Sequence, residues 1–209
     1  MIVRAGVSLY LRLFMEFRVW GREHIPEGPK IFCANHFSST DTFFVITLMN
    51  EPVHMVVGPG FKVPGLRFIL KQGEQINALP EHRASVIDEA CKYLSRGESV
   101  FIFPEGDLNN QDSLRKFYHG MARIAKKSNC PIVPIGVIAP KRYVKEKDKS
   151  ITVNEVTYRT LMVMTGKYFA NIGTPMSFAA EDNVEGITEQ VRERITYLIN
   201  DIKQNKFWS

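Results

Sequence analysis

Cysteine is scarce in this sequence, and the scarcity excludes two kinds of scaffold. Three cysteines, Cys33, Cys91 and Cys130, stand in 209 residues, an odd number with wide spacing. They form neither a ligand pair for a metal ion nor a disulfide framework. We therefore interpret them as small core residues and expect a reducing compartment around the protein.

The sequence also lacks a long apolar run, a cleavage signal and internal repeats. No segment reaches the ~18 uninterrupted apolar residues that a membrane-spanning helix needs. No small-residue cleavage pattern follows the first apolar stretch, so no signal peptide is predicted. Linkers and low-complexity tracts are missing too. Because 44% of the residues are hydrophobic, we expect one globular domain over residues 1–209.

The charge balance favours an anionic partner. The formal net charge is +5 at pH 7, which fits an anionic membrane, an anionic substrate or nucleic acid. No helix-turn-helix, zinc or aromatic-basic signature accompanies the charge, so we expect no nucleic-acid partner.

Residues 1–19 mix apolar and basic side chains. As a helix, this segment would have a large apolar surface with basic flanks, the composition of a helix that lies in a membrane interface. The alternative is a helix packed on the domain's own core. The apolar residues are Ile2, Val3, Val7, Leu9, Leu11, Leu13, Phe14 and Phe17, and the basic ones are Arg4, Arg12 and Arg18.

Helical and strand patterns alternate along the rest of the chain. This alternation predicts an α/β fold, with a mixed, mainly parallel sheet flanked by helices. A final amphipathic helix is expected over residues 187–206, and the charged stretch 141–150 is expected to be a solvated loop. Predicted strands cover residues 31–34, 54–57, 75–77, 99–103, 132–138 and 160–172. Predicted helices cover residues 42–49, 66–71, 83–96 and 118–128.

A histidine and an aspartate stand five residues apart where a predicted strand ends. They are His36 and Asp41, in the segment NHFSSTD over residues 35–41. A carboxylate bonded to one ring N–H fixes the histidine tautomer and stabilises the imidazolium that forms on proton transfer. The spacing suits a turn in which Asp41 opens the next helix. The alternative is a structural histidine with a capping aspartate.

A second polar motif follows the strand predicted over residues 99–103. Pro104 prevents regular strand hydrogen bonding, and Glu105 with Gly106 places a carboxylate and a flexible residue at the strand exit. Alone, this motif would be only a turn with an exposed glutamate. Because two such exits occur, we predict one active site assembled from two strand ends.

The ordered motifs resemble the glycerophospholipid acyltransferases, typified by lysophosphatidate acyltransferase. The pair Asn35-His36, followed after four residues by Asp41, is similar to the family's first signature, and FPEG at residues 103–106 is similar to the second. PIVPI at 131–135 and IGTPM at 172–176 are similar to two later blocks. The resemblance covers residues 21–176 as a catalytic core, which the two predicted terminal helices flank.

The resemblance implies acyl transfer with no bound cofactor and no metal. His36 would act as general base on an acceptor hydroxyl, and Asp41 would orient His36. The hydroxyl would attack an acyl thioester directly, without an acyl-enzyme. The co-substrate would be an acyl-CoA or an acyl carrier protein thioester. The acceptor would be a lysolipid or a glycerol-phosphate-like molecule. Because a lipid-modifying enzyme must reach a substrate in the bilayer, we expect peripheral attachment at the cytoplasmic face of the cell membrane.

Further residues of the same motifs would bind substrate, again by resemblance. Glu105 would hold a hydroxyl or a positively charged group of the acceptor. Asn35, Ser38 and Gly106 would line the same site. Backbone N–H groups between Ser38 and Asp41 would stabilise the oxyanion.

The chain departs from the family pattern where a phosphate of the acceptor would bind. Ala78 and Leu108 stand where the family places arginines, and Asp107 adds a negative charge. Arginine is the preferred bidentate ligand for phosphate, so these departures favour an acceptor without a phosphate monoester. The basic residues able to replace the missing arginines are Arg83, Arg115 and Lys116.

Three alternatives to a lysophosphatidate-type acyltransferase stay open at this point. The first keeps the chemistry but uses a lyso-aminolipid or another non-phosphate acceptor. The second is a non-catalytic lipid-binding protein of the same fold. The third is a hydrolase in which His36 activates water, because a sequence does not show whether water is excluded from a site.

Overall fold

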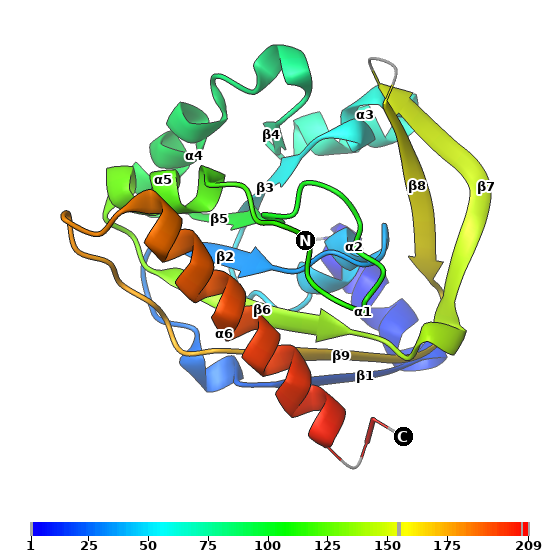
Figure 1. The fold of residues 1–209 in the computed structure, drawn as a ribbon. Coiled ribbons are helices and arrows are strands. Elements are labelled where there is room, and N and C mark those ends of the chain that lie inside the picture. Colours follow the sequence, from blue (N-terminus) through cyan, green and yellow to red (C-terminus); the bar gives the residue numbers. More distant parts are fainter. Residues whose placement is uncertain (1, 154–155, 206, 209) are drawn as a thin grey trace.

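A seven-stranded sheet of order β1-β9-β6-β2-β5-β3-β4 forms the centre of the fold (Figure 1). The computed structural model describes residues 2–153, 156–205 and 207–208. All neighbouring strands are parallel except β6 and β9, so the predicted mixed, mainly parallel sheet is confirmed. The strands are β1 (Met15–Trp20), β2 (Ile31–Ala34), β3 (Val53–Val57), β4 (Ile76–Asn77), β5 (Ser99–Ile102), β6 (Ile132–Ile138) and β9 (Gly166–Ile172).

Helices cover both faces of this sheet, as the alternating pattern predicted (Figure 1). Each face of the sheet carries its own buried hydrophobic cluster. One cluster includes residues of α4, α5 and α6, and the other includes residues of α1 and α2. The helices are α1 (Ile2–Phe14), α2 (Asp41–Val45), α3 (Pro64–Gln72), α4 (Val86–Ser95), α5 (Gly120–Ser128) and α6 (Val184–Gln204). Short 3-10 helices are η1 (Arg22–His24), η2 (Pro59–Lys62), η3 (Pro80–His82) and η4 (Lys141–Tyr143).

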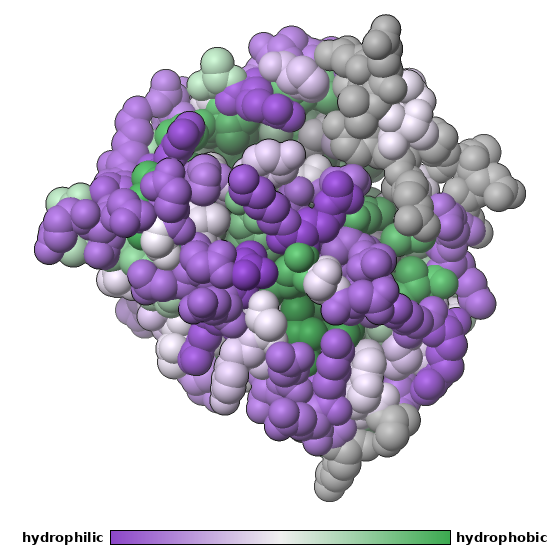
Figure 2. Space-filling model, viewed as in Figure 1, coloured by the Kyte–Doolittle hydropathy of each residue, from purple (hydrophilic) through white to green (hydrophobic). Residues whose placement is uncertain are grey.

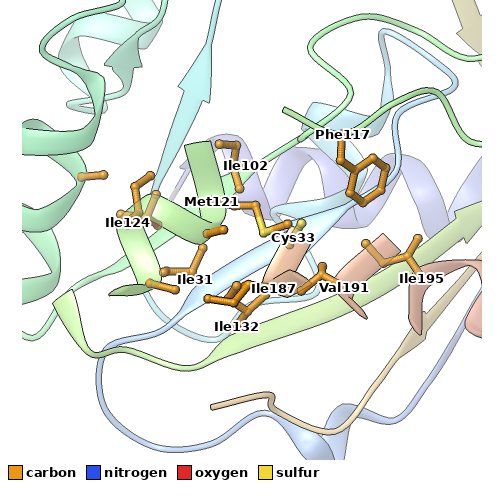
Figure 3. Close-up of a cluster of buried hydrophobic side chains, with 14 of the residues drawn as sticks. Ile31, Cys33, Ile102, Phe117, Met121, Ile124, Ile132, Ile187, Val191 and Ile195 are labelled. Carbon is orange, nitrogen blue, oxygen red and sulfur yellow. The ribbon is translucent and has the colours of Figure 1, made fainter. Parts of the chain in front are cut away.

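The amphipathic stripe of α6 lies on the sheet. Figure 3 shows Ile187, Val191 and Ile195 of this helix meeting Ile132 and Cys33 of the strands, and all five are fully buried. The stripe confirms the predicted C-terminal helix. Its predicted outer end, residue 206, and the predicted start of the chain's first helix, residue 1, lie outside the described residues.

The predicted helix over residues 1–19 is too long. The helix ends at Phe14, and residues 15–20 form strand β1, which pairs in parallel with β9. Met15 and Leu11 are buried between this strand and the helices of the same face. Pairing with a strand about 150 residues away therefore overrides the local helical pattern.

The predicted loop over residues 141–150 and the predicted single strand over 160–172 are wrong as well. The structure has a separate two-stranded ribbon, β7 (Val144–Val153) and β8 (Val156–Val163), followed by β9. Met164 and Thr165 separate β8 from β9, and Gly166, the first residue of β9, has a φ of +93°. The charged residues led to the prediction of a loop, although most of them lie on a strand. The two strands of the ribbon pair only with each other, so residues such as Lys145 and Glu146 stay exposed to water.

The strand directions bring several elements to one edge of the sheet. Strands β2, β5 and β3 are parallel, so they end at the same edge, which we call the carboxyl edge. Strand β6 is parallel to β2 but antiparallel to β9, and β1 runs with β9. Strand β1 therefore starts at the carboxyl edge, and the C-terminal end of α1 lies there too.

Candidate active site

Two loops leave adjacent strands at the carboxyl edge and are bonded to each other. The His36 backbone N–H, just after β2, donates to Glu105 Oε1 at 2.9 Å, just after β5. The Asn109 backbone N–H donates back to the His36 carbonyl at 2.7 Å. The two motifs singled out in the sequence therefore meet in one place, because their strands are parallel neighbours.

The His36 ring faces Asp41. Nδ1 of His36 lies 3.1 Å from Oδ2 of Asp41, and helix α2 begins at Asp41, as predicted from the sequence. The Asp41 side chain is fully buried, whereas the His36 side chain is 17% exposed. Because Nδ1 donates to the carboxylate, Nε2 is the nitrogen left to exchange a proton with a substrate.

Asp41 is held by a second side chain that sequence reasoning missed. The Tyr168 hydroxyl, on β9, donates to Asp41 Oδ1 at 2.9 Å, and Tyr168 is fully buried. Burial, reinforced by the adjacent Asp41 carboxylate, raises the pKa of Tyr168 well above its ordinary value. The phenol therefore stays protonated and remains a hydrogen-bond donor to the carboxylate.

The His36 ring also rests on an aromatic ring from the second loop. Phe103 stacks on it with the ring centroids 4.1 Å apart and the planes 17° from parallel. Phe103 stands in the FPEG segment, in which the sequence analysis assigned roles to the proline, the glutamate and the glycine but none to the phenylalanine. The stacking and the Asp41 hydrogen bond together fix the plane of the imidazole.

The backbone N–H groups of this loop are already occupied. Those of Phe37 and Ser38 both donate to Asp41 Oδ2 at 2.9 Å. Those of Ser39 and Asp41 donate to backbone carbonyls, and that of Thr40 donates to Ser38 Oγ. The expected oxyanion donors between Ser38 and Asp41 are therefore committed to acceptors of the protein itself, within the loop and on β8.

Glu105 binds the protein's own donors rather than facing open space. Its oxygens accept from the backbone N–H of His36 and Arg115 and from the Asn109 side-chain amide, at 2.7–2.9 Å. The side chain is 2% exposed, and burial raises the pKa of its carboxyl despite these hydrogen bonds. The expected contact between Glu105 and an acceptor stays a prediction. Next to it, Gly106 has a φ of +67°, which favours glycine.

Asn35 and Ser38 also point into the protein. The Asn35 amide exchanges two 2.8 Å hydrogen bonds with the backbone of Val137 on β6. The Ser38 hydroxyl lies 2.7 Å from the Thr40 hydroxyl and 3.2 Å from the Leu161 carbonyl of β8. Both predicted substrate-binding residues therefore hold the His36 loop in place. The ribbon of β7 and β8 contributes to this support.

The basic residues expected at the acceptor are spread over the surface. Arg83 lies exposed between η3 and α4, and Lys116 is exposed after the second loop. Arg115 forms a 2.7 Å ion pair with Asp107. Among these three residues, Arg115 is the one whose side chain binds the second loop, and it is already paired with the Asp107 carboxylate there.

Both loops lie in the part of the chain that matches a known protein family. The family described as Acyltransferase matches residues 16–138, a span that contains both loops. The chain belongs to this family. It is 23% identical over 199 residues to 1-acyl-sn-glycerol-3-phosphate acyltransferase alpha of Ovis aries, covering 88% of this chain and 63% of the relative. It is 29% identical over 129 residues to the Pseudomonas aeruginosa 1-acyl-sn-glycerol-3-phosphate acyltransferase, covering 58% and 49%.

Two further similarities concern chain length and fold. The chain spans 39% of the length of the chloroplastic 1-acyl-sn-glycerol-3-phosphate acyltransferase BAT2 of Brassica napus, and 63% of the chain matches at 25% identity. The acyltransferase PlsC from Thermotoga maritima shares the fold, with a TM-score of 0.75 at 22% identity over 100% of this chain and 80% of that one. Within the described residues, no helix has both the length and the apolarity needed to cross a membrane.

Proposed function

We propose that this member of the Acyltransferase family moves a fatty acyl group from a thioester to the hydroxyl of a lysolipid. The observation that carries the proposal is the His36–Asp41 pair, with Asp41 buried and the His36 ring reaching the surface. The names of the relatives support a glycerolipid acceptor. A general base positioned in this way contributes about a hundred- to ten-thousand-fold to a rate.

In the proposed reaction His36 first accepts a proton from the acceptor and then donates it to the leaving group. Nε2 takes the proton of the acceptor hydroxyl while Nδ1–H stays bonded to Asp41, which stabilises the imidazolium. The hydroxyl oxygen bonds to the thioester carbonyl carbon, and the tetrahedral intermediate then breaks its carbon–sulfur bond. The leaving thiolate receives the proton from Nε2. An ester and a free thiol result, and the histidine returns to its starting state.

Two observations favour direct transfer over an acyl-enzyme. The Ser38 hydroxyl is buried and bonded to the Thr40 hydroxyl and the Leu161 carbonyl, so it is not available as a nucleophile. Cys33 is fully buried, and burial raises the pKa of its thiol strongly, with the charge of Glu105 acting in the same direction. Such a thiol supplies no thiolate near neutral pH.

We propose a lysolipid acceptor that does not depend on a phosphate monoester. Leu108 offers no charge, and the neighbouring cation Arg115 is paired with Asp107. A phosphate monoester carries nearly two negative charges at pH 7, so it would have to compete with Asp107 for Arg115. The second candidate is a lysophosphatidate acceptor, which the names of the relatives favour.

The proposed donor is an acyl-CoA or an acyl carrier protein thioester, and the proposed place is the cytoplasmic face of the membrane. Helix α1 supports peripheral attachment, because Leu9, Leu13 and Phe14 are 55–65% exposed. Arg12 is exposed beside them. The side chain of Arg4 lies outside the described residues, and Arg18 is bonded to Glu16 instead.

An acyl-transfer assay on the purified protein tests the proposal. Both donors are offered with a panel of lysolipids, and ester formation and thiol release are measured separately. Transfer gives one ester for each thiol. Thiol release without ester would identify a hydrolase, and no release from either donor would identify a non-catalytic lipid-binding protein.

A further inference from the structure

The large apolar side chains that remain exposed come from a small number of elements. Apart from two tyrosines, those in the described residues come from α1, α2, α3 and the turn between β8 and β9. By contrast, the face that α6 covers is mainly hydrophilic (Figure 2). The exposed apolar residues are Leu9, Leu13, Phe14, Phe43, Phe68, Ile69 and Met164.

Helix α3 carries the most exposed of these residues. Its inner side uses Leu66 and Leu70, which pack against the small cluster around Phe61. Its outer side presents Phe68 and Ile69, which are 67% and 50% exposed. Two large apolar neighbours on the outside of an amphipathic helix favour an apolar environment there.

Helix α3 lies at the same edge of the sheet as the C-terminal end of α1 and the His36 loop. Val57, at the end of β3, packs both on the cluster below α1 and α2 and on the cluster below α3. Helix α3 therefore follows the carboxyl edge on the same side as α1. The His36 loop leaves β2 at that edge, and α1 ends there. Two apolar elements from distant parts of the sequence thus stand at the edge that carries the candidate site.

The charges on α3 indicate what covers Phe68 and Ile69. Arg67 and Lys71 are exposed on either side of the apolar pair. Basic residues flanking apolar ones are typical of a surface that inserts into an anionic bilayer, because the cations meet the head groups while the apolar groups enter the acyl region. A bilayer surface is extended enough to contact the exposed apolar residues of both α1 and α3.

We propose that α3 is a second bilayer contact, with Phe68 and Ile69 inserted and Arg67 and Lys71 at the head groups. Together with α1 it would hold the carboxyl edge against the membrane, so that the His36 ring meets a lysolipid without the lipid leaving the bilayer. This inference rests on the proposed function, which places the acceptor in a membrane.

Vesicle binding by the full-length protein tests the contact. Sedimentation with phosphatidylglycerol–phosphatidylcholine vesicles, without an acyl donor, compares the native protein with Phe68→Ser/Ile69→Ser. We expect the double substitution to weaken binding by about tenfold or more. Tyr197→Ser is the matched control, because Tyr197 is an exposed aromatic residue on α6; its binding should stay within about twofold of the native value.

A measurement of how deeply residue 68 inserts into the bilayer gives a second test, which does not depend on the affinity for vesicles. Phe68→Trp should be quenched by lipids brominated on their acyl chains once the protein is bound, and Tyr197→Trp should not. Bound protein in which residue 68 is not quenched would overturn the proposal. An α3 double variant that binds vesicles as the native protein does would also overturn the proposal. This outcome includes a variant that binds vesicles normally but no longer forms a dimer, or no longer binds acyl carrier protein.

Together with the acyl-transfer assay, the vesicle experiments separate this proposal from the proposed function. A native protein that binds vesicles through α3 but transfers no acyl group would refute the proposed function alone. An active enzyme whose α3 double variant binds vesicles as the native protein does would refute the α3 contact alone.

Discussion

Replacing Tyr168 by phenylalanine removes one hydroxyl from behind the His36–Asp41 pair. That hydroxyl lies 2.9 Å from Asp41 Oδ1, and both side chains are fully buried. A hydrogen bond to a charged group contributes about 1.5–3 kcal/mol, and an unpaired buried oxygen loses its solvation as well. Asp41 keeps three donors on Oδ2, so we place the lost transition-state stabilisation at about 1.5–2 kcal/mol.

This loss corresponds to a fall in kcat of about 10- to 30-fold. The KM for the acceptor should change by less than about twofold, because a fully buried side chain offers no surface to a substrate. Initial rates against acceptor concentration, at saturating donor, separate the two quantities. Tyr197→Phe provides a control in which an exposed hydroxyl is lost.

A Tyr168→Phe variant that keeps its kcat would refute this role of Tyr168. A loss in KM alone would refute it as well, since that result would place Tyr168 at the substrate. Thermal unfolding of the same variant shows how much of the change is stability rather than catalysis. A lower melting temperature with an unchanged kcat would make Tyr168 a purely structural residue.

Three further changes test other parts of the account. Glu105→Gln should lower the free energy of unfolding by about 1–3 kcal/mol in urea titrations, since the amide nitrogen of glutamine cannot accept a hydrogen bond as a carboxylate oxygen does. An unchanged midpoint would contradict the stabilising role of the buried hydrogen bonds to Glu105. Leu108→Arg with Asp107→Thr should raise the preference for a phosphate-monoester acceptor by about tenfold in competition assays; a native preference for that acceptor contradicts our choice. Leu13→Ser with Phe14→Ser should weaken binding to anionic vesicles at low salt; unaltered sedimentation would mean that α1 is only structural.

Local features of the site were predictable from the sequence. His36 and Asp41 are five residues apart, so one turn decides their geometry, and the helix start at Asp41 needed only the local signals for a helix N-terminus. The meeting of the two loops followed from two strand exits in an α/β pattern. Both inferences use short-range information or a general rule of sheet topology.

Long-range features were not predictable in this way. Tyr168 reaches Asp41 from 127 residues away, and nothing around Tyr168 distinguishes it from a core aromatic. The ribbon of β7 and β8 supports Ser38 and Thr40 through backbone groups of β8, which carry no sequence signal. The FPEG motif predicted that Glu105 lies at the site. Its burial, and the hydrogen bonds that its oxygens accept, depend on tertiary packing and were not predictable.

The most direct test of the account is the acyl-transfer rate of His36→Ala. The substitution removes the proposed base from a partly exposed position, so the variant should fold as the native protein does while kcat/KM falls by about a hundredfold or more. His82→Ala is the control, since His82 is an exposed histidine on η3, and it should retain native activity. A folded His36→Ala variant with near-native turnover would contradict the central claim that His36 is the general base.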